Sequence, residues 1–181
     1  MNFEQIKTAT INSFQLFFDS NGIELRVGEL SDSDYVLLCR GYSDLNWDWA
    51  FEKFGNRDEC ISVGIKLVTS EVLDGAMMGV YDLERQTLYM HLMESFVNTE
   101  DHPLRGRMTY FTLVASFLFL SAFGGTTLMF VDPINEQLIA HYQRYGFSAP
   151  QMIDGETMQS IGFEALAAVI ATEAAGMIDK P

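Results

Sequence analysis

Cysteine, proline and basic residues are all scarce in this chain of 181 residues. The two cysteines, Cys39 and Cys60, stand apart, with no CxxC pair and no cluster of histidines near them. This pattern excludes a disulfide framework and a structural zinc site, because both need several cysteine or histidine residues at short spacings. We expect both cysteines to be reduced structural residues, and we expect no metal site.

Only four prolines are present, and no internal repeat, low-complexity run or Pro/Ser-rich linker interrupts the chain. Disorder and a two-domain arrangement are therefore disfavoured. Hydrophobic residues make up 48% of the chain, which is enough to fill one core in a protein of this length. We predict a single domain over residues 1–181, ordered from near residue 1 to about residue 175.

Basic residues are outnumbered, since 11 lysines and arginines stand against 25 aspartates and glutamates, for a net charge of −14. Such an acidic chain excludes nucleic-acid binding through a basic surface. It favours cationic partners, such as a cationic amine substrate or a basic protein segment. The alternative is that the charge serves only solubility.

Long hydrophobic segments are missing as well. The N-terminus has neither the basic segment nor the apolar run of a signal peptide. The most apolar run, residues 108–123, is too short for a membrane span and is better explained as a buried helix. We therefore expect a cytoplasmic protein that makes no membrane contact.

Residues 126–147 are the most informative part of the chain. The first six are β-branched and apolar, as in a strand, and Asp132 and Pro133 end them. Apolar residues then recur at helical spacing over 134–144, and Gly146 can take the left-handed conformation found at helix ends. This segment predicts a strand that leads directly into a helix.

Three further elements are predicted upstream of that segment. Residues 87–97 resemble a strand, residues 102–107 form a basic turn, and residues 108–123 form a helix closed by two glycines. A basic turn before a helix suits anion binding, because free backbone N–H groups and the positive end of the helix dipole point toward it. Arg105 and Arg107 add full charges there.

This order of elements, with Asn135, Tyr142 and the ending Tyr145-Gly146-Phe147, resembles the acetyl-CoA-binding region of the GNAT superfamily of N-acetyltransferases. The resemblance implies an α/β (α+β) fold with a mixed, mostly antiparallel central sheet flanked by helices. The implied activity is direct transfer of an acetyl group from acetyl-CoA to a primary amine of a small molecule or protein. By the same resemblance, Asn135 hydrogen-bonds the pantetheine arm and Tyr142 is the general acid that protonates the departing thiolate. A phenol has a pKa near ~10, so it carries its proton at neutral pH.

The resemblance assigns the pyrophosphate to the turn and the start of the long helix, at Arg105, Gly106, Arg107, Met108, Thr109 and Tyr110. The family usually has small residues at the positions of Met108 and Tyr110, so that bare backbone can approach the phosphates. We therefore expect a divergent acetyl-CoA site. The alternative is a non-catalytic GNAT-fold module, with a lost or reshaped pocket, that binds a partner protein or senses CoA.

In the family, the fourth strand separates from the fifth at a bulge, and the thioester lies in the opening beside a backbone N–H. The equivalent backbone is expected here near Phe96 and Val97. A general base must also take the proton of the acceptor amine. Glu94 and His91 are the candidates on this strand. Because they are three residues apart, we expect them to point to opposite faces, with Glu94 nearer the opening.

Two tryptophans, Trp47 and Trp49, stand among acidic residues in a predicted helical region that ends near Phe54. Their rings could hold a cationic amine or could pack into the core. We favour inward packing for both, because aromatic side chains are mostly buried.

The C-terminal region is expected to depart from the family. Residues 156–175 are rich in Ala, Ile, Leu and Met at helical spacing, which predicts an atypical helix in place of a final strand. We expect this helix either to cover the sheet edge or to form a homodimer interface, and we favour the covering role.

Overall fold

The computed structural model describes the backbone of residues 2–178 and the side chains of residues 2–174. Helices and strands alternate irregularly along the chain. In order, the elements are α1 (Phe3–Ser20), β1 (Leu25–Gly28), α2 (Asp32–Leu37), a short π-helical segment η1 (Leu38–Tyr42), α3 (Trp47–Phe54), β2 (Cys60–Leu67), β3 (Gly75–Asp82), β4 (Thr87–Ser95), α4 (Met108–Phe123), β5 (Thr127–Val131), α5 (Glu136–Arg144), β6 (Gln151–Ile153), β7 (Glu156–Gly162) and α6 (Phe163–Ile178).

One seven-stranded sheet runs through the molecule, in the order β1-β2-β3-β4-β5-β7-β6. Every neighbouring pair is antiparallel except β4 and β5, which are parallel. The parallel pair needs a long crossover connection, and α4 supplies it. This architecture confirms the predicted α/β fold with a mixed, mostly antiparallel sheet flanked by helices.

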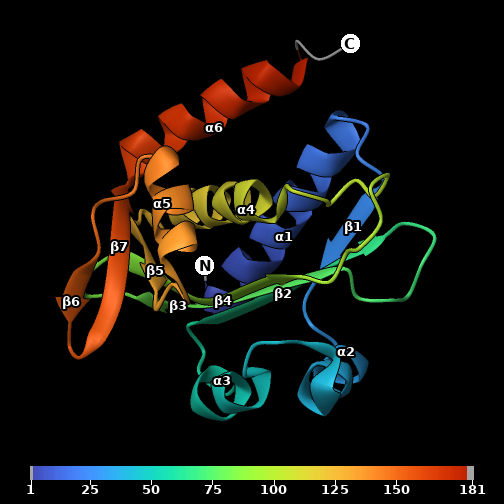
Figure 1. Ribbon diagram of the computed structural model, residues 1–181, viewed down its shortest axis with the longest axis horizontal. Helices are drawn as coiled ribbons and strands as arrows, with labels where there is room; N and C mark the ends of the chain where they lie inside the picture. Colours follow the sequence, from blue (N-terminus) through green and yellow to red (C-terminus); the bar gives the residue numbers. More distant parts are fainter. Residues whose placement is uncertain (1, 179–181) are drawn as a thin grey trace.

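Helices cover both faces of the sheet (Figure 1). The main core lies on the face that α1 and α4 cover, where Phe18 of α1 meets Phe111 of α4 with ring centroids 5.0 Å apart. A smaller core lies on the opposite face, under α3 and η1. Helix α4 packs against α1, α6 and β4. Because these elements surround it, its residues are apolar on nearly every side. The prediction of a buried helix over residues 108–123 is therefore confirmed.

An ion pair joins α2 to the sheet. Lys66 Nζ of β2 lies 2.9 Å from the carboxylate of Asp34, and both side chains are largely buried. The same carboxylate accepts a hydrogen bond from the backbone N–H of Ser31, and the Ser31 hydroxyl accepts one from the N–H of Asp34. This reciprocal cap starts α2 and holds the charge that Lys66 pairs with.

None of the helices within residues 2–178 has both the length and the apolar character that crossing a membrane requires.

The C-terminal region contains two strands, β6 and β7, where a helix was expected from residue 156. The helical prediction is wrong for residues 156–162, which form β7 and pair with β5. Met158 and Ile161 are three apart, which is a helical spacing and not the two-residue alternation of a strand. The missed signal is Asp154-Gly155, where both residues have positive φ, of +51° and +85°. Such a pair makes a two-residue hairpin turn.

Helix α6 starts at Phe163 and packs against α4 and β7. Leu166 is its fully buried contact, with no exposed surface. We expect Leu166→Ala to lower the free energy of unfolding by about 2–4 kcal/mol, because it leaves a cavity between α6 and the core. Urea denaturation measures this change, with the exposed Ala165→Ser as control. Equal stability of the two variants would show that α6 is not docked on the core.

Candidate functional site

The sheet opens between β4 and β5. These strands pair over only four residue pairs, the last of which is Met90 with Phe130. Strand β4 then continues to Ser95, whereas β5 ends at Val131. Within the described residues, the second half of β4 therefore has no strand partner on this side.

A bulge in β4 marks the point of separation. Met90 pairs with Gly79 of β3, and Leu92 pairs with the preceding Met78, so His91 is an extra residue without a partner. A bulge bends its strand and increases the local twist. We attribute the divergence of β4 from β5 to this extra residue.

The separated strands border a cleft with a volume of about 450 Å³. Its walls are the second half of β4, the end of β5 with the loop that follows, α5, and the loop before α3. A space of this size falls within the range of small-molecule sites. The polar and aromatic residues that line it are Asp44, Asn46, Trp49, His91, Glu94, Ser95, Phe130, Asp132, Tyr142 and Glu156.

The cleft is acidic. Its lining includes four carboxylates and neither lysine nor arginine among the described residues; the carboxylates are Asp44, Glu94, Asp132 and Glu156. A concave surface with charge of one sign raises the local concentration of ions of the opposite sign. The cleft therefore attracts cationic groups such as ammonium.

His91 and Glu94 lie on the same side of the sheet, contrary to the expectation that they face opposite ways. The His91 ring stacks on Phe54 of α3, with centroids 4.2 Å apart. Glu94 hydrogen-bonds Trp47, which is also on α3. The extra residue of the bulge shifts the two-residue alternation by one position, so both side chains turn toward α3.

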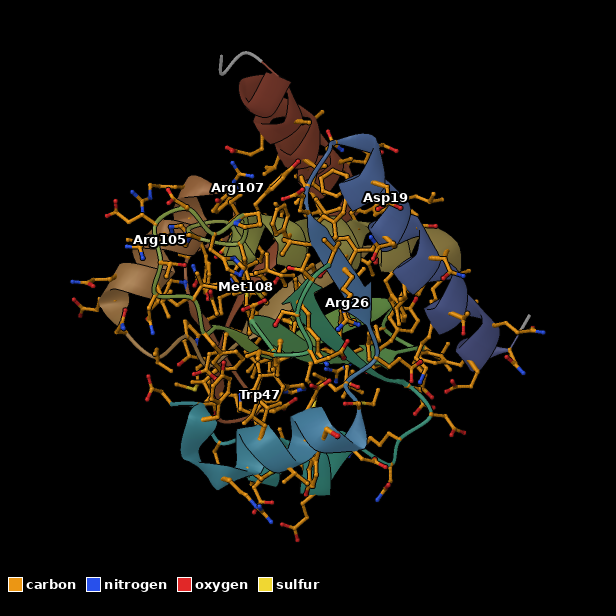
Figure 2. All side chains as sticks on the ribbon, turned by 90° about the vertical axis from the view of Figure 1, so that its right-hand side faces the viewer. Asp19, Arg26, Trp47, Arg105, Arg107 and Met108 are labelled. Atoms are coloured by element: carbon orange, nitrogen blue, oxygen red, sulfur yellow. The ribbon has the colours of Figure 1, made fainter. Side chains whose placement is uncertain are left out.

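Both carboxylate oxygens of Glu94 accept hydrogen bonds. Oε1 accepts from the backbone N–H of Asp44 at 2.8 Å, and Oε2 accepts from the indole N–H of Trp47 at 2.8 Å. These bonds fasten the loop before α3 to β4, and Trp47 lies buried between the sheet and α3 (Figure 2). Glu94 therefore holds one wall of the cleft in place as well as lining it.

The two tryptophans have different surroundings. Trp47 is buried, as expected, whereas Trp49 is 42% exposed and lines the cleft. Inward packing is therefore wrong for Trp49, because two positions along a helix correspond to a rotation of about 200°. Lys53 Nζ lies 4.7 Å from the centre of the Trp49 ring, so that ring already contacts a cation.

His91 is uncharged at neutral pH. Burial, together with the nearby charges of Lys53 and Arg57, lowers the pKa of His91 to about 4, and Asp132 acts in the opposite direction. A neutral imidazole has one N–H donor and one acceptor nitrogen. The bulge thus places a neutral hydrogen-bonding ring at the edge of the acidic cleft.

Tyr142 lines the cleft from α5. It is 5% exposed, and its ring meets Phe130 edge to face with centroids 4.6 Å apart. Burial raises the pKa of Tyr142 to about 12. The hydroxyl therefore keeps its proton through the neutral and mildly alkaline range.

Asn135 does not line the cleft but begins the helix that does. Its side-chain oxygen accepts a hydrogen bond from the N–H of Leu138 at 2.9 Å and caps α5. The cap uses only the amide oxygen, so the amide NH₂ group remains a donor.

The opening lies closer to the start of β4 than expected, and neither Phe96 nor Val97 borders it. The N–H of Phe96 donates to the carbonyl of Asp74 at 2.8 Å, and its ring packs on Tyr42 with centroids 4.8 Å apart. Val97 packs against the main core. The difference arises because the bulge lies at His91, near the middle of the strand.

Met108 and Tyr110, at the start of α4, point into the protein. Met108 is 8% exposed, and its Sδ would lie 3.0 Å from a Cβ placed on Gly75 of β3. Tyr110 is 4% exposed and packs edge-on against Phe17. Both bulky side chains are thus accommodated in the core and do not project from the outer surface of the turn.

The outer surface of the same turn has the chemistry of an anion site. No side chain caps the first turn of α4, so its backbone N–H groups face outward without that partner. Arg105 and Arg107 lie toward the outside of the molecule relative to Met108 (Figure 2). Gly106, between them, has a φ of +69° and open space around it. The Arg105 guanidinium donates to the carbonyl of Asn98 at 3.0 Å, which orients it.

Helix α5 connects this turn with the cleft. Leu138 and Tyr142 line the cleft, while His141 Nε2 lies 3.2 Å from the Thr109 hydroxyl on the first turn of α4. The other ring nitrogen of His141 lies 3.1 Å from Arg144. His141 was not identified from the sequence, because its contact depends on how α5 packs against α4. Helix α5 therefore contacts both the start of α4 and the cleft.

Asp132 and Glu156 also line the cleft without having been identified from the sequence. Asp132 has a φ of +47°, a conformation that residues with side chains rarely adopt. Its N–H donates to the Thr157 carbonyl at 2.7 Å, and its carboxylate accepts from the Thr157 N–H at 2.9 Å. In the sequence, the Asp132-Pro133 pair marks the end of a strand, and this signal could have indicated Asp132. Glu156 reaches the cleft because β7 pairs with β5, and that strand was not predicted.

Solved structures of acetyltransferases are similar to this chain. A protein from T. thermophilus, provisionally assigned as an acetyltransferase, aligns with a TM-score of 0.58 and 13% identity, over 84% of this chain and 93% of its own. A point mutant of the spermidine N-acetyltransferase SpeG from Vibrio cholerae aligns with a TM-score of 0.56 and 11% identity, over 80% and 96%. An uncharacterized protein from Bacillus halodurans aligns with a TM-score of 0.62 and 9% identity, over 84% and 91%.

No protein-family model matches the sequence, and no curated protein is similar to it in sequence. At identities of 9% to 13%, structural similarity establishes the fold alone. The chain therefore has a GNAT-like fold, the fold of acetyltransferases, as the resemblance predicted.

Proposed function

We propose that this chain is an N-acetyltransferase that moves an acetyl group from acetyl-CoA directly to a primary amine. The observation that carries the proposal is the cleft between β4 and β5, which is lined by a buried, protonated tyrosine. The similarity of the fold to that of acetyltransferases also supports the proposal.

The proposed acetyl-CoA site extends from the cleft to the turn before α4. The proposed diphosphate site is the outer surface of the turn, with Arg105, Arg107 and the uncapped N–H groups of α4 as donors. The free NH₂ of Asn135 is the proposed donor to an amide carbonyl of the pantetheine arm. When bound, acetyl-CoA supplies the activated acyl group.

Tyr142 is the proposed general acid. Its hydroxyl donates a proton to the sulfur that leaves as the acyl carbon–sulfur bond breaks and the carbon–nitrogen bond forms. Burial, which raises the pKa of Tyr142 to about 12, keeps the donor protonated before this step. It also makes the resulting phenolate unfavourable, so the hydroxyl regains a proton before the next turnover.

Glu94 is the proposed base that takes the amine proton, directly or through a water molecule. Its carboxylate already accepts two hydrogen bonds, but a carboxylate has about four lone-pair sites. His91, uncharged and on the same side of the sheet, is the alternative acceptor of that proton.

An amine acceptor is supported by the acidic lining of the cleft. One structural neighbour is named as a spermidine N-acetyltransferase, so an amine is the acceptor of at least one protein with this fold. Another structure of that enzyme is a dodecamer. Self-association of this chain, including a homodimer, stays a prediction.

Acetyl-CoA should raise the melting temperature of the protein by mass action. At a hundredfold excess over Kd, the expected stabilisation is about 2.7 kcal/mol, or roughly 5 to 10 °C for a chain of this size. Arg107→Gln should reduce the shift, because it removes a charge from the proposed diphosphate site. Arg40→Gln, which removes a charge distant from α4 in sequence, is the matched control. No shift at millimolar acetyl-CoA would favour the non-catalytic module instead.

Tyr142→Phe tests the general acid. We expect kcat to fall about 100-fold, the usual order for loss of a positioned proton donor, with little change in the melting shift caused by acetyl-CoA. The phenyl ring preserves the packing against Phe130. Unchanged turnover in this variant would remove the assignment.

Glu94→Gln and Trp47→Phe together separate base chemistry from positioning. Both variants disturb the hydrogen bond between the two side chains, but only the first removes the carboxylate. We expect Glu94→Gln to lower kcat about 100-fold and Trp47→Phe to lower it much less. Equal losses of kcat in the two variants would mean that Glu94 acts only by holding the loop.

A further inference from the structure

The side chain of His102 attaches the turn before α4, residues 102–107, to the sheet. This side chain is 8% exposed, and its Nε2 lies 3.3 Å from the carboxylate of Asp74, the residue just before β3. Nε2 is buried, and among the described residues it has no hydrogen-bond partner elsewhere. A buried polar atom is costly without a partner, so the contact with Asp74 fixes the orientation of the ring.

The other ring nitrogen of His102 organises the turn itself. Nδ1 accepts a hydrogen bond from the N–H of Leu104 at 3.1 Å, so it carries no hydrogen. The hydrogen of the neutral ring is therefore on Nε2, on the side of the Asp74 carboxylate. The carbonyl of His102 also accepts from the N–H of Arg105 at 3.0 Å. One residue further, the carbonyl of Leu104 accepts from the N–H of Arg107 at 3.0 Å.

Asp74 is itself held firmly between two strands. Its second carboxylate oxygen accepts a hydrogen bond from the N–H of Leu67, the last residue of β2, at 2.9 Å. Its backbone N–H donates to the carbonyl of Ile65 at 2.9 Å, and its carbonyl accepts from the N–H of Phe96, just after β4, at 2.8 Å. Asp74 is therefore a rigid partner for His102, and the backbone at both arginines of the turn is connected to the sheet through these bonds.

We propose that His102 is a positioning residue for the diphosphate of acetyl-CoA. This inference rests on the proposed function, in which the outer surface of the turn binds the diphosphate. His102 faces inward to Asp74, whereas Arg105 and Arg107 lie toward the outside of the molecule (Figure 2). Groups that are held in their binding geometry before the ligand arrives lose less conformational freedom on binding. His102 thus acts on affinity through the backbone of the turn.

The variant His102→Asn separates the two contacts of the ring. The Asn side-chain oxygen can still accept from the N–H of Leu104, as in an Asx turn, but the side chain is too short to reach Asp74. We expect the Kd for acetyl-CoA, measured by calorimetry with the full chain, to rise about tenfold, the order expected for loss of one charge-assisted hydrogen bond. The Kd for S-acetylpantetheine, which lacks the diphosphate, should not change.

Asp34→Asn is the matched control. It weakens the ion pair with Lys66, which is buried to a similar degree but holds α2 instead of the turn. Both variants should lower the melting temperature of the free protein, because each disturbs a largely buried pair. Only His102→Asn should weaken the binding of acetyl-CoA.

A double-mutant cycle with Arg107→Gln provides a second measurement, which also decides the case where S-acetylpantetheine binds too weakly for a Kd. When Arg107 is absent, His102→Asn should raise the Kd for acetyl-CoA less than it does in the unaltered chain, because part of what His102 positions is gone. Independent effects of the two substitutions, whose factors multiply, would contradict the proposal.

The outcomes separate this inference from the proposed function. If Arg107→Gln raises the Kd for acetyl-CoA and His102→Asn does not, the positioning role is overturned while the proposed diphosphate site stands. If His102→Asn raises the Kd for both ligands by the same factor, the residue supports the fold in general, and the inference fails. If the unaltered chain does not bind acetyl-CoA at all, the proposed transferase itself fails.

Discussion

One extra residue in β4 determines the arrangement of the candidate site. Without His91 as a bulge, β4 would keep the alternation of a regular strand, with His91 and Glu94 on opposite faces. The bulge separates the two strands and brings His91 and Glu94 to the same face. The cleft, the position of the α3 loop and the approach to Tyr142 all follow from that shift in register.

Much of the fold could be predicted because local signals were strong. Residues 108–123 form a helix at the predicted bounds, because an unbroken apolar run is closed by Gly124 in the left-handed conformation. The helix predicted over residues 134–144 was also clear and corresponds to α5, and both Tyr142 and Glu94 line the cleft. These features depend on interactions between residues close together in the sequence, so they can be predicted from a single sequence.

The remaining features depend on contacts between distant segments. A bulge inside β4 leaves no mark on the sequence pattern. The extra residue at His91 therefore could not be predicted, and the opening was expected near Phe96 and Val97. The outward turn of Trp49 depends on how α3 docks. Strand β7 joins the rest of the sheet by pairing with β5, a segment distant in sequence, and its apolar residues have a helical spacing.

The close fit between Gly75 and the start of α4 limits which residue types can occupy these positions. Gly75 has no room for a side chain, because Leu104 and Met108 occupy the space that a Cβ would need. A chain that regained a small residue at 108 would gain an empty pocket beside β3, and a larger residue at 75 could then fill it. Because Leu104 also approaches this space, the residue types at positions 75, 104 and 108 constrain one another.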